Sequence, residues 1–354
     1  MAAWENNLRK VMPYTPGEQP QSEGVIKLNT NENPYPPAPG VSKAIKNMDL
    51  DSAMRKYPDP TSRRLIKALA EYHGVDEDQI FVGTGSDDVL SIGFLTFFNS
   101  DKPIFFPDVT YSFYPVWANV YSIPYREIPL DESYRIDPKD YSGDGECGGV
   151  VIANPNAPTG IAMDLKEIER IVRSNPDVIV IVDEAYIDYG GESALPLLYD
   201  FDNLVIVRTF SKSRAMAGMR LGYAISSARL IRAMNDVAQS VNSYTKSATT
   251  LVAGVASIED DEYFRSRIDD VVRTRARTVL ELKNRGFHVL PSSANFIFAK
   301  PAWIDGKELF EELRSRSIYV RHFGGERIKD YLRITIGTDQ EMEALFAAID
   351  EIKG

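Results

Sequence analysis

The stretch DVIVIVDEAYIDY, residues 177–189, decides the fold that this sequence predicts. Residues 178–182 form an uninterrupted run of β-branched side chains, which is typical of a strand buried on both faces of a parallel sheet. The run stops at two carboxylates, Asp183 and Glu184. Because ligands of open α/β sheets bind beyond the carboxyl ends of the strands, we expect Asp183 to face a crevice.

Two further apolar runs end in polar residues in the same way. Residues 149–153 are apolar and are followed at once by Asn154, which opens NPNAPTG. The stretch RTFSKSRAMAGMRLGY, residues 208–223, places Lys212 just past another apolar run, although a surface lysine in a basic loop is the simpler interpretation of that stretch alone. Since parallel strands end at one edge of a sheet, an amide, a carboxylate and an amine should converge there.

These groups match the needs of pyridoxal phosphate, an aldehyde cofactor. An amine such as that of Lys212 can hold the aldehyde as a Schiff base and afterwards act as a base. A carboxylate such as Asp183 keeps the pyridine nitrogen protonated. Tyr186 and Asn154 can donate hydrogen bonds to the phenolate oxygen of the ring. The sequence therefore predicts a cofactor site at this edge.

The stretch QIFVGTGSDDVLSIGFL, residues 79–95, predicts an anion site for the cofactor phosphate. Residues 80–82 indicate a short strand, and residues 83–88 indicate a turn that opens a helix, where free N–H groups and the helix dipole favour an anion. Two alternatives stay open for the turn: an ordinary strand-to-helix connection, and a dinucleotide fingerprint that lacks one of its glycines. The candidate phosphate contacts are Gly85, Ser86, Asp87, Ser211, Ser213 and Arg220.

The order and spacing of motifs along nearly the whole chain resemble those of the class I/II aminotransferases, pyridoxal-phosphate enzymes of fold type I. The motifs are PYTPGEQP (13–20), LNTNENPYPP (28–37), RKYPDP (55–60), GTGSDD (83–88), NPNAPTG (154–160), VDEAY (182–186), TFSK (209–212), ANFIF (294–298) and LRITIGT (332–338). The resemblance implies an α/β fold, with a mostly parallel sheet flanked by helices in a large domain and a small α+β domain beside it.

The resemblance also implies a role for each candidate residue. Lys212 would bind the cofactor covalently, Asp183 would meet the pyridine nitrogen, and Tyr186 and Asn154 would contact the ring oxygen. Tyr111, in the aromatic run after a strand at 103–106, would stack on the ring, whereas the run by itself is equally typical of core. The implied phosphate contacts are Gly85, Ser86, Asp87, Ser211, Arg220 and Tyr57, the last from the neighbouring subunit of a homodimer, and Thr209 is implied as a further cofactor-binding residue.

On the substrate side, the resemblance implies two oxyanion-binding arginines, Arg321 and Arg333, with Tyr14 and Asn31 as further contacts. A guanidinium can bind a phosphate or a carboxylate in bidentate fashion, so the sequence leaves open which arginine binds which group. The implied reaction is transamination of L-histidinol phosphate with 2-oxoglutarate, giving imidazole acetol phosphate and L-glutamate. Transamination of aromatic amino acids and decarboxylation of threonine phosphate are the alternatives.

The segment after the lysine departs from the common pattern of the family. Where many relatives have small or apolar residues, this chain has Ser213, Arg214 and Met216. Arg214 could add charge near the phosphate or could face solvent, and the sequence does not decide between these interpretations.

Length and composition agree with a soluble enzyme of two lobes. The chain has 354 residues, more than one hydrophobic core usually supports, with 44% hydrophobic and 26% charged residues. A net charge of −11 without basic blocks disfavours nucleic-acid binding. Three histidines without ligand spacing disfavour a metal site, and the single cysteine, Cys147, fits a reducing compartment. Since neither a signal-peptide core nor a membrane-spanning stretch is apparent, we expect a cytoplasmic protein.

The pattern of expected elements divides the chain into three parts. Residues 1–41 are proline-rich, and we expect them to lie across the active site and pack on the small domain. Strands alternate with helical patterns over 42–256, which predicts the large cofactor-binding domain. A long amphipathic helix at 262–285 and short strands follow in a small C-terminal domain, 257–354.

Two function classes outside this family explain the sequence less well. An NAD-dependent oxidoreductase could use the turn at 83–88 but would leave Lys212 and Asp183 without roles. A cofactor-binding regulatory module would need a basic DNA-binding domain, for which the predicted domains leave no room.

Overall fold

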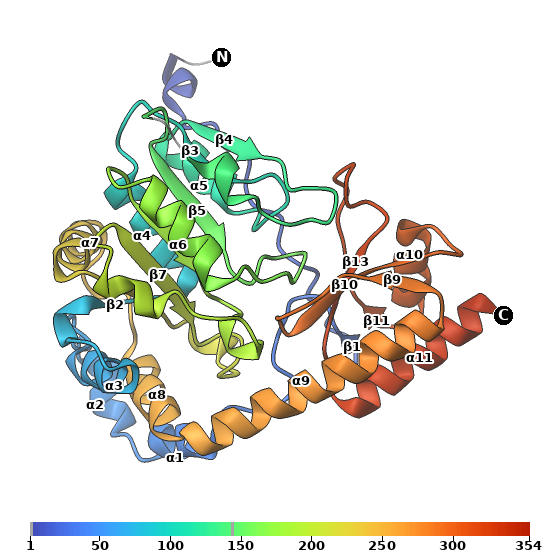
Figure 1. The fold of residues 1–354 in the computed structure, drawn as a ribbon. Coiled ribbons are helices and arrows are strands. Elements are labelled where there is room, and N and C mark those ends of the chain that lie inside the picture. The colour runs from blue at the N-terminus through green and yellow to red at the C-terminus, as the bar shows by residue number, and fades with distance from the viewer. Residues whose placement is uncertain (1–2, 143–144) are drawn as a thin grey trace.

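A seven-stranded sheet forms the centre of the protein, and the computed structural model describes residues 3–142 and 145–354 (Figure 1). The strand order is β2-β8-β7-β6-β5-β3-β4. Strand β8 is antiparallel to both of its neighbours, and the other pairs are parallel. In that order the strands are Ile80–Gly83, Gly222–Ser226, Leu204–Thr209, Val180–Asp183, Gly149–Ala153, Ile104–Pro107 and Tyr125–Ile128.

The central strands are buried on both faces because helices cover each face. Ile181 of β6 packs in a cluster with α4 (Ser86–Phe97), α5 (Tyr114–Tyr121) and α7 (Ala228–Val241). Val180 and Val182 of the same strand pack on the opposite face, against α6 (Leu165–Ser174). This alternation follows from the period of two in a strand, and it explains why the run is apolar without interruption.

A further group of helices packs beside β2 and β8. This group contains α1 (Pro39–Lys46), α3 (Arg63–His73) and α8 (Ala248–Glu259), with α2 (Leu50–Arg55) next to them in Figure 1. Short 3-10 helices lie at Ala3–Asn7, Glu77–Gln79, Pro138–Tyr141, Ile187–Tyr189, Leu195–Tyr199 and Ala217–Met219.

The small lobe contains a four-stranded antiparallel sheet in the order β12-β13-β10-β9. Its strands are Arg321–His322, Leu332–Thr335, Phe296–Pro301 and Phe287–Val289, and its helices are α10 (Gly306–Ser315) and α11 (Asp339–Lys353). The helix α9 (Asp261–Asn284) confirms the long helix expected at 262–285, and Figure 1 shows it running from the α1 and α8 region to this sheet.

The N-terminal segment is joined to the small lobe. Its strand β1 (Ile26–Lys27) pairs in parallel with β11 (Ile318–Tyr319), and the N–H of Thr335 donates to the carbonyl oxygen of Leu28. These contacts attach the segment to the small lobe, and the division of the chain at 41 and 256 stays a prediction. No helix in the described residues combines the length and apolar character needed to span a membrane.

Candidate active site

A cavity of about 250 Å³ opens where the large sheet, the N-terminal segment and the small lobe meet. Most of the predicted site residues contribute to its wall, although they come from distant parts of the chain. Those residues are Tyr14, Asn31, Ser86, Asp87, Tyr111, Asp183, Tyr186, Ser211, Lys212, Arg220, Arg321 and Arg333.

Asp183 is the last residue of β6, whereas the sequence predicted that the strand would end one residue earlier. Its side chain is 5% exposed and accepts hydrogen bonds from the Tyr114 hydroxyl at 3.0 Å and from the Ala185 N–H at 3.2 Å. Burial raises the pKa of the Asp183 carboxyl to about 7, against 3.8 in solution. A positive charge placed beside this carboxylate would be stabilised strongly, as the protonated ring nitrogen of the expected cofactor would be.

Lys212 reaches the same cavity from the turn after β7. Its Nζ donates to the carbonyl oxygen of Thr30 at 3.1 Å and lies 5.7 Å from the centre of the Tyr186 ring. The Tyr186 hydroxyl in turn accepts a hydrogen bond from Asn31 Nδ2 at 2.9 Å. An amine, a buried carboxylate and a phenol thus share one wall, which is the donor set that the sequence predicted.

The phosphate end of the predicted site is a turn packed against β8. Helix α4 begins at Ser86, and Gly85 before it has a φ of 87°, a conformation that favours glycine. A Cβ added at Gly222 would lie 2.4 Å from the Ser86 nitrogen, so bare backbone is required there. Arg220 Nη2 lies 3.3 Å from Asp87 Oδ2 beside the turn. The first N–H groups of α4 and the Arg220 guanidinium suit a phosphate.

The two predicted oxyanion-binding arginines lie opposite each other on neighbouring strands, Arg321 on β12 and Arg333 on β13. Arg321 donates to the carbonyl oxygens of Thr15 and Pro16, and Arg333 donates to that of Asn29 at 2.9 Å. Among the described residues, neither guanidinium pairs with a carboxylate, and the buried Arg333 Nε has no acceptor. Like charges that face each other across a ladder destabilise it, so this pair favours a bound anion.

Burial lowers the pKa of Arg333 below its usual value, so its charge is poorly solvated at this wall. Tyr14 closes the cavity on the side of the N-terminal segment, and its ring stacks on Phe113 at 4.2 Å. Tyr111 donates its hydroxyl hydrogen to Asp87 at 2.9 Å, and both residues line the cavity.

Four of the residues implied by the family resemblance are not part of the cavity wall, and their roles stay predictions. Asn154 accepts the Met163 N–H at 2.8 Å, and Thr209 accepts the Ser211 N–H at 3.1 Å. A Cβ added at Gly85 would lie 2.7 Å from Arg220 Nη2, so the Arg220 guanidinium packs directly on this glycine. Tyr57 is 81% exposed and packs on Tyr244.

The structure corrects two expectations for the segment after Lys212. Ser213 is not a phosphate contact, because its hydroxyl donates to Asp188 away from the cavity. Arg214 neither faces solvent nor adjoins the predicted phosphate site. It is 7% exposed, donates to the Ser257 carbonyl oxygen at 2.5 Å, and lies 3.9 Å from the centre of the Phe264 ring. This arginine is a buried packing residue that an aromatic cage stabilises.

Residues 23–349 match the family model described as aminotransferase class I and II. The chain belongs to this family. The dinucleotide interpretation of the turn at 83–88 is therefore wrong, and the α/β fold of the aminotransferases is confirmed.

Similar proteins agree with the family assignment over the whole chain. The histidinol-phosphate aminotransferase of Lactococcus lactis subsp. cremoris (strain MG1363) is 49% identical over 99% of this chain and 97% of its own length. That of Acinetobacter baumannii (strain AB307-0294) is 46% identical over 99% and 97%. The crystal structure of the Sinorhizobium meliloti histidinol-phosphate aminotransferase in complex with pyridoxal-5'-phosphate has a TM-score of 0.85 at 25% identity, covering 92% of this chain and 90% of that one.

Sequence reasoning missed two residues that shape this aminotransferase site. Tyr114 donates to Asp183, but it lies in an aromatic run that looked like core. Asn33 donates from Nδ2 to the carbonyl oxygens of Lys212 and Ser213 at 3.2 and 3.0 Å. The motif LNTNENPYPP contains Asn33, but only the folded structure shows which amide of that motif meets the lysine turn.

Proposed function

We propose that this aminotransferase binds pyridoxal phosphate and transfers the amino group of L-histidinol phosphate to 2-oxoglutarate. The products would be imidazole acetol phosphate and L-glutamate. The observation that supports the proposal most is the convergence of Lys212, Asp183 and the α4 turn on one cavity whose far wall holds Arg321 and Arg333. The relatives named above, with identities of 46% and 49%, support the choice of substrate.

The residues present fit pyridoxal phosphate. When bound, this cofactor supplies an aldehyde for an amine and a ring that accepts electrons from the substrate Cα. Asp183 would face the ring nitrogen, whose positive charge would offset the cost of burying this carboxylate. The phosphate contacts would be Ser86, Ser211, Arg220 and the first N–H groups of α4.

Lys212 has two tasks in this proposal. Its Nζ would hold the cofactor, and its free amine would remove the proton from the substrate Cα. General base catalysis by a positioned group contributes roughly 10²- to 10⁴-fold to a rate. Tyr186, held by Asn31 at 2.9 Å, would donate to the ring oxygen next to this amine.

Arg321 and Arg333 would bind the oxyanion of each amine donor in turn. Histidinol phosphate carries a phosphate where glutamate carries its α-carboxylate, so one guanidinium pair can serve both substrates. Tyr14 and Asn31 would provide further substrate contacts, because both belong to the cavity wall.

The proposal includes a homodimer. Tyr57, Tyr244 and the neighbouring Met54 and Val241 form an exposed apolar patch, which is a common mark of an interface. In such a dimer Tyr57 would reach the cofactor phosphate of the partner subunit, so that each active site would need both chains.

Half-reactions with single donors test the substrate. The holoenzyme is mixed with L-histidinol phosphate, L-phenylalanine or L-threonine phosphate, and the visible absorption band of the cofactor is followed. We expect histidinol phosphate to react with a kcat/KM at least about 100-fold above that of phenylalanine, because phenylalanine offers the arginines no phosphate. A faster reaction with phenylalanine would favour an aromatic aminotransferase, and release of CO₂ from threonine phosphate would favour a decarboxylase.

A further inference from the structure

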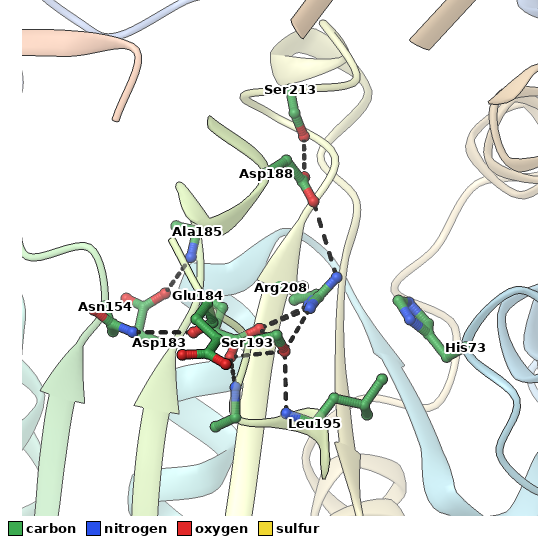
Figure 2. A network of polar contacts seen from close by, with 12 residues as sticks. His73, Asn154, Asp183, Glu184, Ala185, Asp188, Ser193, Leu195, Arg208 and Ser213 are labelled. Carbon is green, nitrogen blue, oxygen red and sulfur yellow. Dashed lines mark hydrogen bonds and ion pairs between the residues drawn. The ribbon is translucent and has the colours of Figure 1, made fainter. Parts of the chain in front are cut away.

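A series of polar contacts outside the cavity ends at Ser213, the residue next to Lys212. Ser213 is 4% exposed, and its hydroxyl donates to Asp188 Oδ2 at 2.5 Å. Asp188 Oδ1 lies 3.9 Å from Arg208 Nη1, and Figure 2 shows Asp188 between Arg208 and Ser213. None of these three side chains belongs to the cavity wall. The contacts therefore act on the backbone that carries the lysine and not on a ligand.

The other end of this series of contacts is a buried ion pair between Arg208 and Glu184. Arg208 donates from Nε to Glu184 Oε2 at 2.9 Å, and its Nη2 lies 2.8 Å from the same oxygen. The Ser193 hydroxyl and the Ala194 N–H also donate to Glu184 (Figure 2). Burial alone would lower the pKa of Arg208, but the charge of Glu184 raises it. Because Glu184 accepts hydrogen bonds from several donors, it holds this end of the series of contacts in place.

Glu184 and Arg208 lie close in sequence to the predicted cofactor-binding residues Asp183 and Lys212. Glu184 directly follows Asp183 at the end of β6, and Arg208 lies on β7, four residues before Lys212. The ion pair thus joins the two strand ends that present the carboxylate and the amine. Asp188 extends the connection to the turn after β7.

A second contact holds the lysine turn from the other side. Asn33 Nδ2 donates to the carbonyl oxygens of both Lys212 and Ser213. The backbone of Lys212 is therefore held through the Ser213 hydroxyl and through its own carbonyl group. Residues fixed by such supporting hydrogen bonds keep a reactive side chain in one place.

We propose that Asp188 and Ser213 are positioning residues for Lys212, anchored through Arg208 on Glu184. Neither touches substrate or cofactor, and both act by fixing where the Lys212 amine stands when it removes the substrate proton. The inference rests on the proposed function, because it gives Lys212 the part of the base. A misplacement of about 1 Å can cost 10²-fold in rate, so a lost anchor should be measurable.

The test compares Ser213→Ala, Asp188→Ala and the double variant with the wild-type holoenzyme. We expect each single variant to lower kcat about tenfold while KM for the amine donor stays unchanged, since the cavity wall is intact. The primary isotope effect with a Cα-deuterated donor should rise, because proton transfer becomes slower than the other steps. The double variant should have a kcat no lower than that of either single variant, because each substitution removes the same hydrogen bond.

A second measurement uses the apoprotein. The rate at which added pyridoxal phosphate becomes attached to Lys212 is followed by absorbance and by trapping with borohydride. We expect attachment to be several-fold slower in Ser213→Ala and Asp188→Ala, while thermal unfolding changes little. A role in folding alone would alter the unfolding temperature without changing the isotope effect or this rate.

Ser226→Ala is the matched control. Ser226 is also a buried serine, and its hydroxyl donates to the Leu204 carbonyl oxygen at 2.6 Å, at the other end of β7. This variant should keep the wild-type kcat and isotope effect. Asp188→Asn keeps an acceptor for the Ser213 hydroxyl and should recover kcat to within about threefold of the wild type.

Three outcomes would overturn the proposal: a Ser213→Ala enzyme with wild-type kcat and isotope effect, additive losses in the double variant, or an Asp188→Asn enzyme as slow as Asp188→Ala. In each case the wild type would still react, so the proposed function would stand. If wild-type Lys212 fails to attach the cofactor, the proposed function fails, and the positioning role fails with it.

Discussion

Asp183 shows how a single residue links the fold to the chemistry. It ends a strand whose other residues are fully buried, and the Tyr114 hydroxyl is its one side-chain donor among the described residues. The protein thus keeps a carboxylate at a position where burial makes its charge costly. Such a cost is expected at a functional site, because the cofactor's positive ring nitrogen would remove it.

Asp183→Asn should stabilise the apoprotein in a pH-dependent way. The folded pKa of Asp183 is about 7 against 3.8 in the unfolded chain, so the unfolded state loses its proton first as the pH rises. The penalty on the wild type is absent below about pH 4, grows through the window up to about pH 7 and is then complete, at roughly 4 kcal/mol. Urea unfolding of both apoproteins between pH 4.5 and about 8 measures the difference, and a difference that does not change with pH would contradict this account.

Arg333→Lys should impair substrate binding without unfolding the protein. Lysine keeps the charge but loses the bidentate geometry, so we expect kcat/KM for glutamate and for histidinol phosphate to fall by about 10- to 100-fold. Arg214→Lys is the matched control, because Arg214 is a buried arginine outside the cavity. Steady-state kinetics measure both variants, and equal losses of kcat/KM would refute the role of Arg333.

The sequence predicted residues at strand ends better than residues that approach from elsewhere. Asp183 and Lys212 follow apolar runs, so their place at the sheet edge could be predicted from periodicity and from the rule for open sheets. Tyr114 and Asn33 could not be predicted in this way, because the direction of a phenol or an amide depends on packing. Arg214 was uncertain for the same reason: a guanidinium caged by aromatic rings has no sequence signal of its own.

At the scale of elements, β8 explains both the sheet topology and the phosphate turn. The connection from β7 to β8, residues 210–221, contains Lys212 and a single short 3-10 helix, and β8 returns antiparallel. The sequence predicted a mostly parallel sheet but not this reversed strand, because strand order depends on contacts distant in the chain. Gly222, at the start of β8, lies against the beginning of α4.

Gly222→Ala should therefore weaken cofactor binding. The added Cβ would lie 2.4 Å from the Ser86 nitrogen and 2.5 Å from the Gly85 carbonyl carbon, so the turn must move away. Overpacking of this kind costs about 1–3 kcal/mol, and we expect a corresponding loss of affinity for pyridoxal phosphate. Gly324→Ala is the control, since its Cβ would meet no atom within 4 Å in the described structure. Titration of the apoproteins measures the affinities, and equal values for the two variants would exclude this function of Gly222.

At the scale of the whole molecule, the active site depends on parts that are distant in sequence. The N-terminal segment pairs with the small lobe through β1 and β11, and it places Tyr14 and Asn31 over a cavity whose floor belongs to the large sheet. The proline-rich, irregular character of the segment predicted that it lies across the active site, and the family resemblance added Tyr14 and Asn31 as contacts. The hydrogen bond from Thr335 Oγ1 to Asn31 Oδ1 joins two residues that are 304 positions apart in the sequence.

Tyr57→Glu should dissociate the proposed dimer. A charge placed in the exposed apolar patch would be buried in the interface, and the phosphate contact from the partner would be lost. We expect a single-chain species in sedimentation velocity and a cofactor affinity at least about tenfold weaker. Tyr199→Glu is the control, because Tyr199, at the end of a 3-10 helix, is an equally exposed tyrosine. A wild-type protein that sediments as a monomer with full cofactor affinity would contradict the shared active site.

The most direct measurement is borohydride reduction of the protein loaded with pyridoxal phosphate, followed by peptide mapping. The account predicts that the mass of the reduced cofactor is found on the peptide that contains Lys212 and that Lys212→Ala carries none. A label on a different lysine, or no label on the wild type, would contradict it.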